Sequence, residues 1–193
     1  MGRYTTRIIT DAEYKTIITT IKSGFTGTDG VKREPNAPIA TALILEANLG
    51  IRINDVLHLA LSDIIKDGDH WRLDITEEKT DKKRTYIVPQ EIYAFIADYC
   101  HTNNIGQQRR IFQFGERQAQ KHLKATCDYL GLENVSTHSF RKFVGNSLYE
   151  DSNHDIELVR DFYQHSSVAV TQRYLKRSNA QLENAIAKHI KLL

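Results

Sequence analysis

His138 and Arg141 stand three residues apart in the segment THSFRK. This spacing places both side chains on one face of a helix. A guanidinium offers a planar fork of donors to an oxyanion, and an imidazole can pass a proton. The pair therefore suits chemistry on a phosphate-like anion. His-x-x-Arg is also common by chance, and taken alone the pair is explained more simply by two surface side chains.

Two further groups of charged residues could serve the same chemistry. Arg52, in GIRIND, lies in a joint between two expected helices, where Asp55 could brace it. Lys79, Lys82 and Lys83 lie at an expected hairpin tip, from which an ammonium could enter a site and donate a proton. Each also has an ordinary explanation. These are a stabilising salt bridge for Arg52 and a soluble charged turn for the lysines.

The segment HSSVAVTQRYL contains His165 and, nine residues later, Tyr174. Ser166 and Ser167 can cap a short helix that Tyr174 would close. His165 would point into a cleft if the preceding helix is packed. Tyr174 is then either a packing residue, with its hydroxyl bonded to water or backbone, or a nucleophile.

Helices are the main elements expected to position these residues. Thr10 and Glu13 form a capping-box pattern before the first helix. Asn36, Pro38 and Gly50 are typical of the start and end of the second helix, and the third is expected to be capped by Asn54. Apolar spacing predicts helices over 10–23, 37–49, 54–63, 90–102, 117–130, 136–150, 154–165 and 179–193.

Strands are expected only in the middle of the chain. WRLDIT and RTYIVP alternate with period two around a charged turn, which predicts a hairpin or small sheet. Gly24 to Asn36 is expected to be a polar loop. The fold class is therefore mostly α with a small antiparallel β-sheet (α+β), without the strand–helix alternation of a parallel sheet.

Composition narrows the class of protein without naming a partner. The 193 residues suffice for one domain with a core, and the sequence shows neither a signal peptide nor a membrane span. Cys100 and Cys127 fit no metal or disulfide spacing, which favours buried, reduced thiols in a cytoplasmic protein. Residues 79–124 hold nine Lys or Arg against four Asp or Glu, so a basic face for phosphate backbones competes with an ordinary charged surface.

The order of these segments resembles the tyrosine recombinase (phage integrase) family, over about residues 10–175. LGIRINDVLHLALSDI resembles the arginine box of that family, and EEKTDKKRTYIVP resembles its lysine hairpin. LGLENVSTHSFRKFVGNSLYE resembles its His-x-x-Arg box, and HSSVAVTQRYL its final box. Four boxes in order are a specific signal, which implies the fold of a tyrosine recombinase catalytic domain.

The resemblance implies a site-specific DNA recombinase that integrates or excises a mobile element. Tyr174 would attack the scissile phosphate, giving a 3′-phosphotyrosyl link and a free 5′-hydroxyl. Arg52 and Arg141 would hold the non-bridging oxygens, with a further hydrogen bond from His165. The phenol is a better leaving group than an alkyl alcohol, so the link stays activated for religation.

The remaining roles complete a reaction that needs no metal or cofactor. Lys79 would protonate the 5′-oxygen and is preferred to its neighbours because it stands in a Lys-Thr pair. His138 would accept the tyrosine proton or orient the phosphate. Backbone contacts to double-stranded DNA are expected from a basic set of residues. That set is Arg109, Arg110, Arg117, Lys121, Lys82 and Lys83.

The chain departs from the family pattern in three places. Tyr163-Gln164 replaces Leu-Gly before the last histidine, and Asp55 replaces the usual glutamate. The resemblance places a catalytic domain at 1–178 and an amphipathic helix at 179–193, which docks either on a neighbouring protomer of a tetramer on DNA or on its own domain. Most members carry an amino-terminal core-binding domain that this sequence does not contain, so we expect either that this region was removed or that the protein works without it.

Two other functions remain open at this point. A non-catalytic DNA-binding protein of the same fold would lack part of the catalytic set. A type IB topoisomerase-like enzyme would share the chemistry but relax DNA without exchanging strands.

Overall fold

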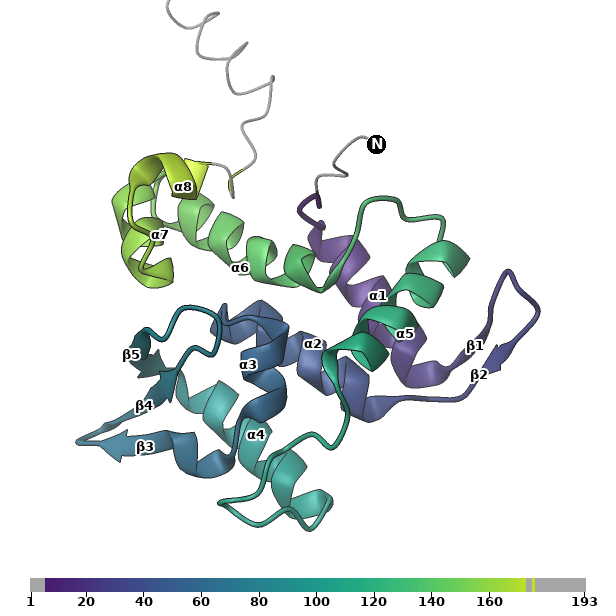
Figure 1. Cartoon of the computed structure of the whole chain (residues 1–193), viewed down its shortest axis with the longest axis horizontal. Helices are drawn as coiled ribbons and strands as arrows, with labels where there is room; N and C mark the ends of the chain where they lie inside the picture. The colour runs from purple at the N-terminus through teal and green to yellow at the C-terminus, as the bar shows by residue number, and fades with distance from the viewer. Residues whose placement is uncertain (1–5, 173–174, 176–193) are drawn as a thin grey trace, which may run out of the picture. The chain divides into compact units, whose positions relative to one another are not determined.

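The computed structural model describes residues 6–172 and residue 175. The chain divides into two compact units, Met1–Val144 and Gly145–Leu193, and each is described by itself. Figure 1 labels the helices and strands in chain order. The first unit contains α1 (Asp11–Ser23), α2 (Ala37–Leu49), α3 (Ile53–His58), η1 (Leu61–Asp63), α4 (Gln90–Thr102), α5 (Glu116–Tyr129) and the first half of α6 (Thr137–Asp151).

The core of the first unit forms around α2. This helix is apolar on almost all sides, and it buries residues from Ile39 to Leu49 around its circumference. It contacts α1 and α3, while α5 contacts α1 and α3 as well. Ile17 and Ile21 of α1 and Phe140 of α6 are fully buried in the same core. The turn between α2 and α3, which bears Arg52, is thus anchored in the core.

Two small antiparallel sheets complete the first unit. β1 (Phe25–Thr26) and β2 (Lys32–Arg33) form a short hairpin. β3 (Ile64–Asp67), β4 (His70–Thr76) and β5 (Lys83–Val88) form a three-stranded sheet in that order. In the β4–β5 register, Leu73 lies opposite Tyr86 and Ile75 lies opposite Arg84.

The structure confirms the mostly helical α+β prediction and several of its details. The Thr10–Glu13 capping box is formed, and Asn36 caps α2 by accepting the N–H of Ile39. Gly50 ends α2 in the left-handed region, at φ 60°. Both cysteines are buried and free.

Two local predictions were wrong, and a third was incomplete. The expected loop between Gly24 and Asn36 contains the β1–β2 hairpin. The expected hairpin or small sheet is a small sheet, with a third strand, β3, that the sequence did not indicate. Asn54 does not cap α3, because the helix begins at Ile53 and the buried carboxylate of Glu46 accepts the N–H of Ile53. None of the helices in the described residues is long and apolar enough to cross a bilayer.

The second unit contains the end of α6, α7 (Ile156–Tyr163) and α8 (Val168–Gln172). α7 packs against α8. Gly145 of α6 lies so close to Tyr163 that an added Cβ would meet the tyrosine oxygen at 2.5 Å. The predicted helix at 179–193 lies outside the described residues.

Candidate active site

The α2–α3 turn fixes the backbone of Arg52. The N–H of Gly50 donates to the carbonyl of Glu46 at 3.1 Å, and Ile51 and Ile53 on either side of Arg52 are buried. The hydroxyl of Tyr86 donates to the carbonyl of Leu49. The Arg52 side chain keeps 26% exposure, so its guanidinium is held at one end and reaches the surface.

The first turns of α6 carry His138 and Arg141. Ser139 and Phe140, between them, are fully buried, which fixes the rotation of the helix about its axis. The side chain of Arg141 is only 1% exposed. The predicted His-x-x-Arg pair therefore lies on a helix, with both residues drawn towards the interior of the first unit.

Arg52 and Arg141 meet at a carboxylate that the sequence prediction did not include. Nη1 of Arg52 lies 2.5 Å from Oε2 of Glu77, and Nη1 of Arg141 lies 3.5 Å from Oε1 of the same residue. The side chain of Glu77 is 4% exposed. The structure thus brings the two predicted catalytic arginines to a single buried carboxylate.

A signal for Glu77 was present in the alternation of β4. Leu73 is buried and Ile75 half-buried on the inward face of this strand, and the period of two continues to Glu77. On β5 the same period turns Arg84, Tyr86 and Val88 inward. Because EEK was interpreted as a soluble turn, the inward position of its first glutamate was missed.

Asp55 does not brace Arg52 in the way that the sequence suggested. Its Oδ1 accepts the backbone N–H of Glu78 at 3.1 Å, and the ion pair of Arg52 is with Glu77. The shorter aspartate is buried at the base of the hairpin turn. Asp55 therefore supports the turn that bears Lys79. It supports Arg52 only indirectly, through that turn.

Lys79 lies exposed in the turn between β4 and β5. The turn is closed by backbone hydrogen bonds from Glu77 to Lys82 at 2.9 Å and from Asp81 to Glu77 at 2.8 Å. The Thr80 hydroxyl donates to Oε2 of Glu77 at 2.8 Å. The predicted proton donor thus stands two residues from the carboxylate that holds the arginines.

Arg52, Glu77, Lys79, His138 and Arg141 form the candidate cluster. Its positive charges could bind an anion, and they favour the neutral form of His138. Burial lowers the pKa of His138 to about 4, together with the charges of Arg141, Lys142, Arg52 and Lys79. The imidazole is therefore neutral at pH 7 and able to accept a proton.

Glu77 is the ionised carboxylate of the cluster. Burial raises its pKa, but hydrogen bonds from Thr80 and Arg52 and the charge of Arg141 outweigh burial and leave the pKa below its usual value. Burial holds the pKa of Glu46 well above its usual value, although the charge of Arg141 lowers it. Three guanidiniums pair with the one carboxylate of Glu77, so cationic charge exceeds anionic charge at this point. They are those of Arg52, Arg84 and Arg141.

His165 is placed by the second unit. Gln164 ends α7 in the left-handed region, at φ 51°, which turns the chain where the family pattern has glycine. The ring of His165 stacks on Tyr163 with centroids 5.0 Å apart, and its Nδ1 lies 3.0 Å from the Thr171 hydroxyl. Tyr174 itself lies outside the described residues, so its role stays a prediction.

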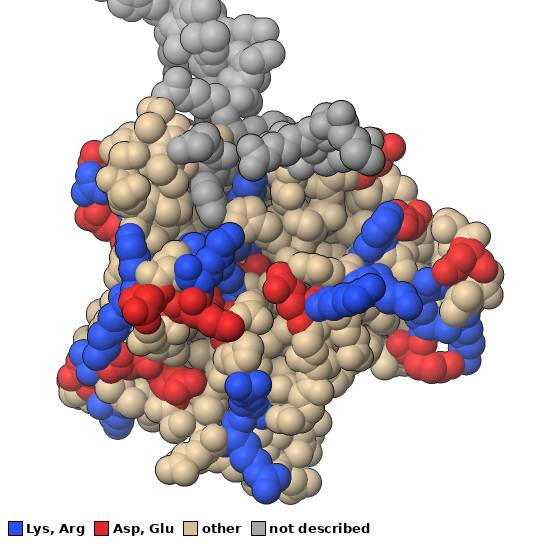
Figure 2. Space-filling view, viewed as in Figure 1, with Lys and Arg blue, Asp and Glu red and all other residues tan. Residues whose placement is uncertain are grey.

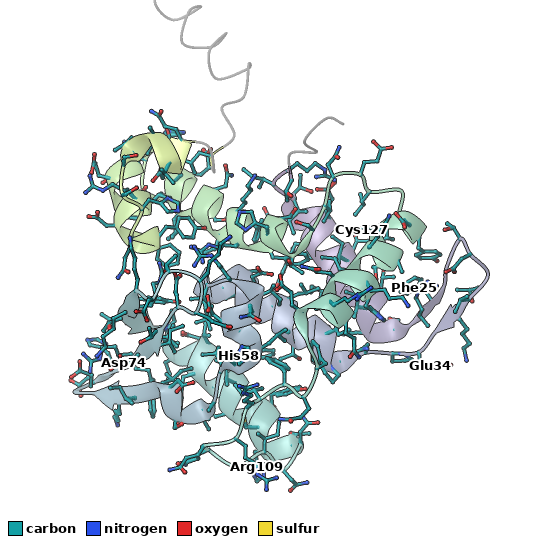
Figure 3. All side chains as sticks on the ribbon, in the orientation of Figure 1. Phe25, Glu34, His58, Asp74, Arg109 and Cys127 are labelled. Carbon is teal, nitrogen blue, oxygen red and sulfur yellow. The ribbon has the colours of Figure 1, made fainter. Side chains whose placement is uncertain are left out.

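The residues predicted to contact DNA lie on separate elements. Lys82 and Lys83 are exposed near the hairpin turn, where Lys83 pairs with Asp74 at 3.2 Å. Arg117 and Lys121 are exposed on the first half of α5. Figure 3 shows Arg109 on the connection that follows α4, at the lower edge of the first unit.

Arg110 differs from the other predicted DNA contacts. It lines a hollow together with four carboxylates, those of Asp55, Asp63, Asp74 and Glu78. On the face of the first unit seen in Figure 2, Lys and Arg side chains lie among Asp and Glu side chains and form no single broad basic surface. Within residues 6–172 and residue 175, no group of three His, Cys, Asp or Glu side chains could hold a metal ion.

Comparison with known sequences identifies relatives. The sequence pattern of the phage integrase family matches residues 7–181. The probable integrase/recombinase YoeC of Bacillus subtilis (strain 168) is 34% identical over 137 residues, which cover 68% of this chain and 74% of YoeC. The family match extends beyond the described residues and includes all four boxes that carry the resemblance.

Solved structures support the fold. The XerH site-specific recombinase bound to palindromic difH, in a post-cleavage complex, has a TM-score of 0.72 at 18% identity. That match covers 97% of this chain and 54% of the XerH chain, so this chain spans about half of the larger protein. XerA recombinase has a TM-score of 0.64 at 18% identity, over 100% of this chain and 67% of its own. The predicted fold class is thereby confirmed.

Proposed function

The chain belongs to the phage integrase family of enzymes that cleave and rejoin DNA, and we propose that it is a site-specific recombinase acting through a 3′-phosphotyrosyl intermediate. The observation that carries this proposal is the meeting of Arg52 and Arg141 on one buried carboxylate, beside a neutral His138 and the turn that bears Lys79. Guanidiniums that converge on one point with excess positive charge suit a phosphodiester.

In the proposed reaction, the Tyr174 oxygen attacks the scissile phosphorus and its proton passes to neutral His138. The bond to the 5′-oxygen breaks as Lys79 protonates that oxygen, while the phosphate remains attached to tyrosine at the 3′ side. Arg52 and Arg141 offset the negative charge that develops on the non-bridging oxygens. The reverse sequence rejoins the strand without an external energy source.

His165 would add a hydrogen bond to one non-bridging oxygen. Its imidazole is oriented by Tyr163 and Thr171 within the second unit. Contacts with these two neighbours limit rotation of the imidazole ring, and a well-oriented hydrogen bond requires such a fixed ring.

The assembly proposed for this reaction is a tetramer on two DNA sites. A lambda integrase tetramer bound to a Holliday junction has a TM-score of 0.67 with this chain at 17% identity. The residues expected to link protomers are 179–193, through the apolar face predicted there. Integration or excision of a mobile element is the proposed biological role, in the cytoplasm, where reduced cysteines are ordinary.

Covalent capture tests the reaction and identifies the DNA site in one experiment. The protein is incubated with a pool of nicked duplexes that carry randomised sequence, denatured, and recovered with any DNA still attached. Wild-type protein should enrich one sequence in a covalent adduct, and Tyr174→Phe should recover none. Enrichment of a non-covalent site alone would favour a DNA-binding protein. Relaxation of supercoiled DNA that carries the captured site, without strand exchange, would favour a topoisomerase-like enzyme.

A further inference from the structure

The buried carboxylate of Glu77 joins two parts of the proposed active site. One oxygen, Oε2, accepts from Arg52 at 2.5 Å and from the Thr80 hydroxyl at 2.8 Å. The other, Oε1, lies 3.5 Å from Nη1 of Arg141 and 3.9 Å from Nε of Arg84. A single residue therefore contacts the arginines from three elements and the turn that carries the lysine.

Charge explains why a carboxylate stands at this position. Arg84 and Arg141 have side chains only 1% exposed, and Arg52 approaches them from the α2–α3 turn. Three guanidiniums this close repel one another in a poorly screened interior. The charge of Glu77 offsets part of that repulsion and gives Arg52 and Arg141 a common point to which both are held.

The backbone of Glu77 also closes the lysine turn. Its N–H donates to the carbonyl of Lys82, and its carbonyl accepts from Asp81. The Thr80 hydroxyl, next to Lys79, donates to the same carboxylate oxygen as Arg52. Any displacement of the carboxylate would thus be transmitted both to the arginines and to the turn.

Burial distinguishes Glu77 from Arg52 and Lys79. Its negative charge, which repels a phosphate, distinguishes it from the similarly buried Arg141. The Glu77 side chain is 4% exposed, against 26% for Arg52, while Lys79 is exposed. A phosphate that reaches Arg52 from solvent would therefore leave Glu77 in place beneath the guanidinium. Glu77 supports the reacting groups and does not meet the substrate.

We propose that Glu77 is a positioning residue, whose carboxylate holds Arg52 and Arg141 and ties the Lys79 turn to them. The inference rests on the proposed function and deepens it, because it makes phosphate binding and leaving-group protonation depend on one side chain. Glu77→Gln should therefore harm both steps, whereas loss of Lys79 should harm only protonation.

A pair of substrates separates the two steps. One is a nicked duplex with the captured site, and the other has sulfur in place of the 5′-bridging oxygen at the scissile phosphate. A thiolate, with a parent thiol pKa of about 8.5, leaves without a proton donor. The sulfur substrate should restore cleavage by Lys79→Ala almost fully and should not restore cleavage by Arg52→Ala.

The extent to which the sulfur substrate restores cleavage by Glu77→Gln should lie between that for Lys79→Ala and that for Arg52→Ala. With the oxygen substrate we expect single-turnover cleavage to slow on the order of 100-fold or more. With sulfur, part of this loss should be recovered, because the protonation defect is bypassed and the arginine defect remains. Glu91→Gln is the matched control, since the same change on the exposed first turn of α4 lies outside the lysine turn and the arginine contacts, and it should cleave both substrates at the wild-type rate.

Thr80→Val provides a second variant if Glu77→Gln does not fold. It removes the hydrogen bond from the Thr80 hydroxyl to Oε2 without altering charge. Cleavage of the oxygen substrate should slow several-fold, and the sulfur substrate should restore the rate. Folding of each variant is checked by circular dichroism and thermal unfolding.

The outcomes separate the two proposals. A folded Glu77→Gln that cleaves the oxygen substrate as fast as wild type, or whose loss is unchanged by sulfur, overturns the inference alone. If Glu77→Gln does not fold, the inference rests on Thr80→Val. It is overturned if this variant cleaves the oxygen substrate as fast as wild type, or if its slower cleavage is the same with the sulfur substrate. Wild-type protein that forms no adduct with either substrate overturns the proposed function and the inference with it.

Discussion

His138 lies one helical turn before Arg141 on α6, and burial together with the Arg141 guanidinium holds the pKa of its imidazole at about 4. This relationship places a neutral base beside a phosphate-binding cation. An imidazole with an ordinary pKa of about 6.5 would be partly protonated near neutral pH, so a smaller fraction of the protein would hold the neutral ring, although that ring would be the stronger base.

NMR titration of the DNA-free protein should therefore show His138 changing protonation near pH 4. The unfolded imidazole binds its proton near pH 6.5, whereas the folded one binds it only near pH 4. The unfolded state thus holds more protons between these values, and the free energy of unfolding should decrease as pH falls from 6.5 to 4. The loss should be on the order of 2–3 kcal/mol.

His138→Gln provides the control for this prediction. The variant removes the titrating group, so its free energy of unfolding should depend less on pH across the same interval. Titration of His138 near pH 6.5 in the folded protein would contradict the argument.

Arg52 should not tolerate lysine. Arg52 uses Nη1 for Glu77 and has other donors for a phosphate, whereas an ammonium is a single point with no fork. Arg52→Lys should slow adduct formation on the order of 100-fold or more while DNA affinity changes only a few-fold. Arg33→Lys, which makes the same change on the β1–β2 hairpin where Arg33 pairs with Asp29, should leave the rate unaltered. Equal losses in the two variants would show that the effect is not local to the site.

How far sequence alone reaches is illustrated by Arg52 and Glu77. Arg52, His138 and Arg141 could be proposed as site residues because the boxes that contain them follow one another in the order of the family, although each local pattern alone has an ordinary explanation. Glu77 could not be identified in the same way, since its partners are 25 and 64 residues away in the chain. Asp55 was assigned to the wrong partner for the same reason, because proximity in sequence suggested Arg52 and the fold supplied Glu78.

The short β elements failed for a different reason. β1 and β2 have two residues each, too few for an alternation to be visible. β3 has a single buried residue, Ile64, and its other three residues are exposed. Such strands are defined by pairing with a neighbour and not by their own pattern, so only the longer β4 and β5 could be predicted.

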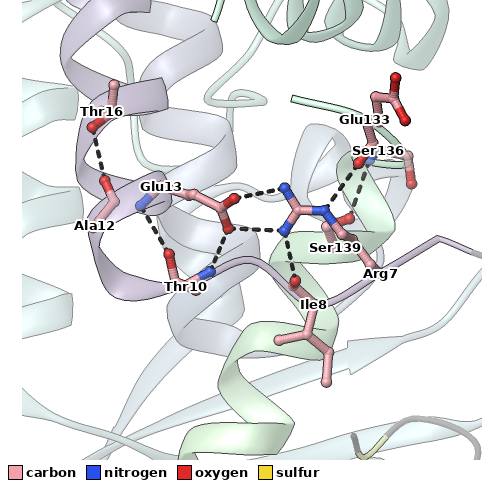
Figure 4. Close-up of polar contacts among 9 residues, drawn as sticks. All are labelled: Arg7, Ile8, Thr10, Ala12, Glu13, Thr16, Glu133, Ser136 and Ser139. Atoms are coloured by element: carbon pink, nitrogen blue, oxygen red, sulfur yellow. Dashed lines mark hydrogen bonds and ion pairs between the residues drawn. The ribbon is translucent and has the colours of Figure 1, made fainter. Parts of the chain in front are cut away.

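The N-terminal segment should contribute stability that depends on the charge of Glu13. Figure 4 shows its carboxylate accepting from Arg7, whose Nε in turn donates to the carbonyl of Glu133 before α6. The hydrogen bond from Arg7 is the main cause that lowers the pKa of Glu13 to about 2. The stabilisation should be fully present above about pH 4.5 and lost as pH falls towards 2.

Glu13→Gln should lower the free energy of unfolding at pH 7 by about 1 kcal/mol, a value reduced by partial exposure of the pair. Near pH 2 the difference between wild type and variant should shrink. Urea unfolding at both pH values measures it, with Glu133→Gln as the control, because its backbone carbonyl, the acceptor for Arg7, is unchanged. A pH-independent difference would refute the assignment to the ion pair.

Salt dependence should identify the basic residues that contact the DNA backbone. Removal of one phosphate contact should reduce the slope of log affinity against log salt concentration by about 0.9. Arg117→Gln and Lys121→Gln, on the exposed part of α5, should each do so, whereas Lys32→Gln should not, since Lys32 pairs with Glu34 on the hairpin. Arg110→Gln should have a smaller effect than the two α5 variants, because Arg110 lines a hollow together with four carboxylates. Slopes that match wild type in the Arg117, Lys121 and Arg110 variants would remove these three residues from the interface.

Gln164 should cost the second unit some stability. Its backbone lies in the left-handed region at φ 51°, where an L side chain is strained by roughly 1 kcal/mol and glycine is not. Glycine gains freedom in the unfolded chain, which offsets part of the benefit. Gln164→Gly should therefore raise the free energy of unfolding by about 0.5 kcal/mol. Gln172→Gly, the same change at the end of α8, should lower the free energy of unfolding by about 0.5–1 kcal/mol. Glycine at this helical position loses more conformational freedom on folding and relieves no strain. Thermal unfolding of the two variants compares them directly, and equal destabilisation would mean that the left-handed turn before His165 carries no strain.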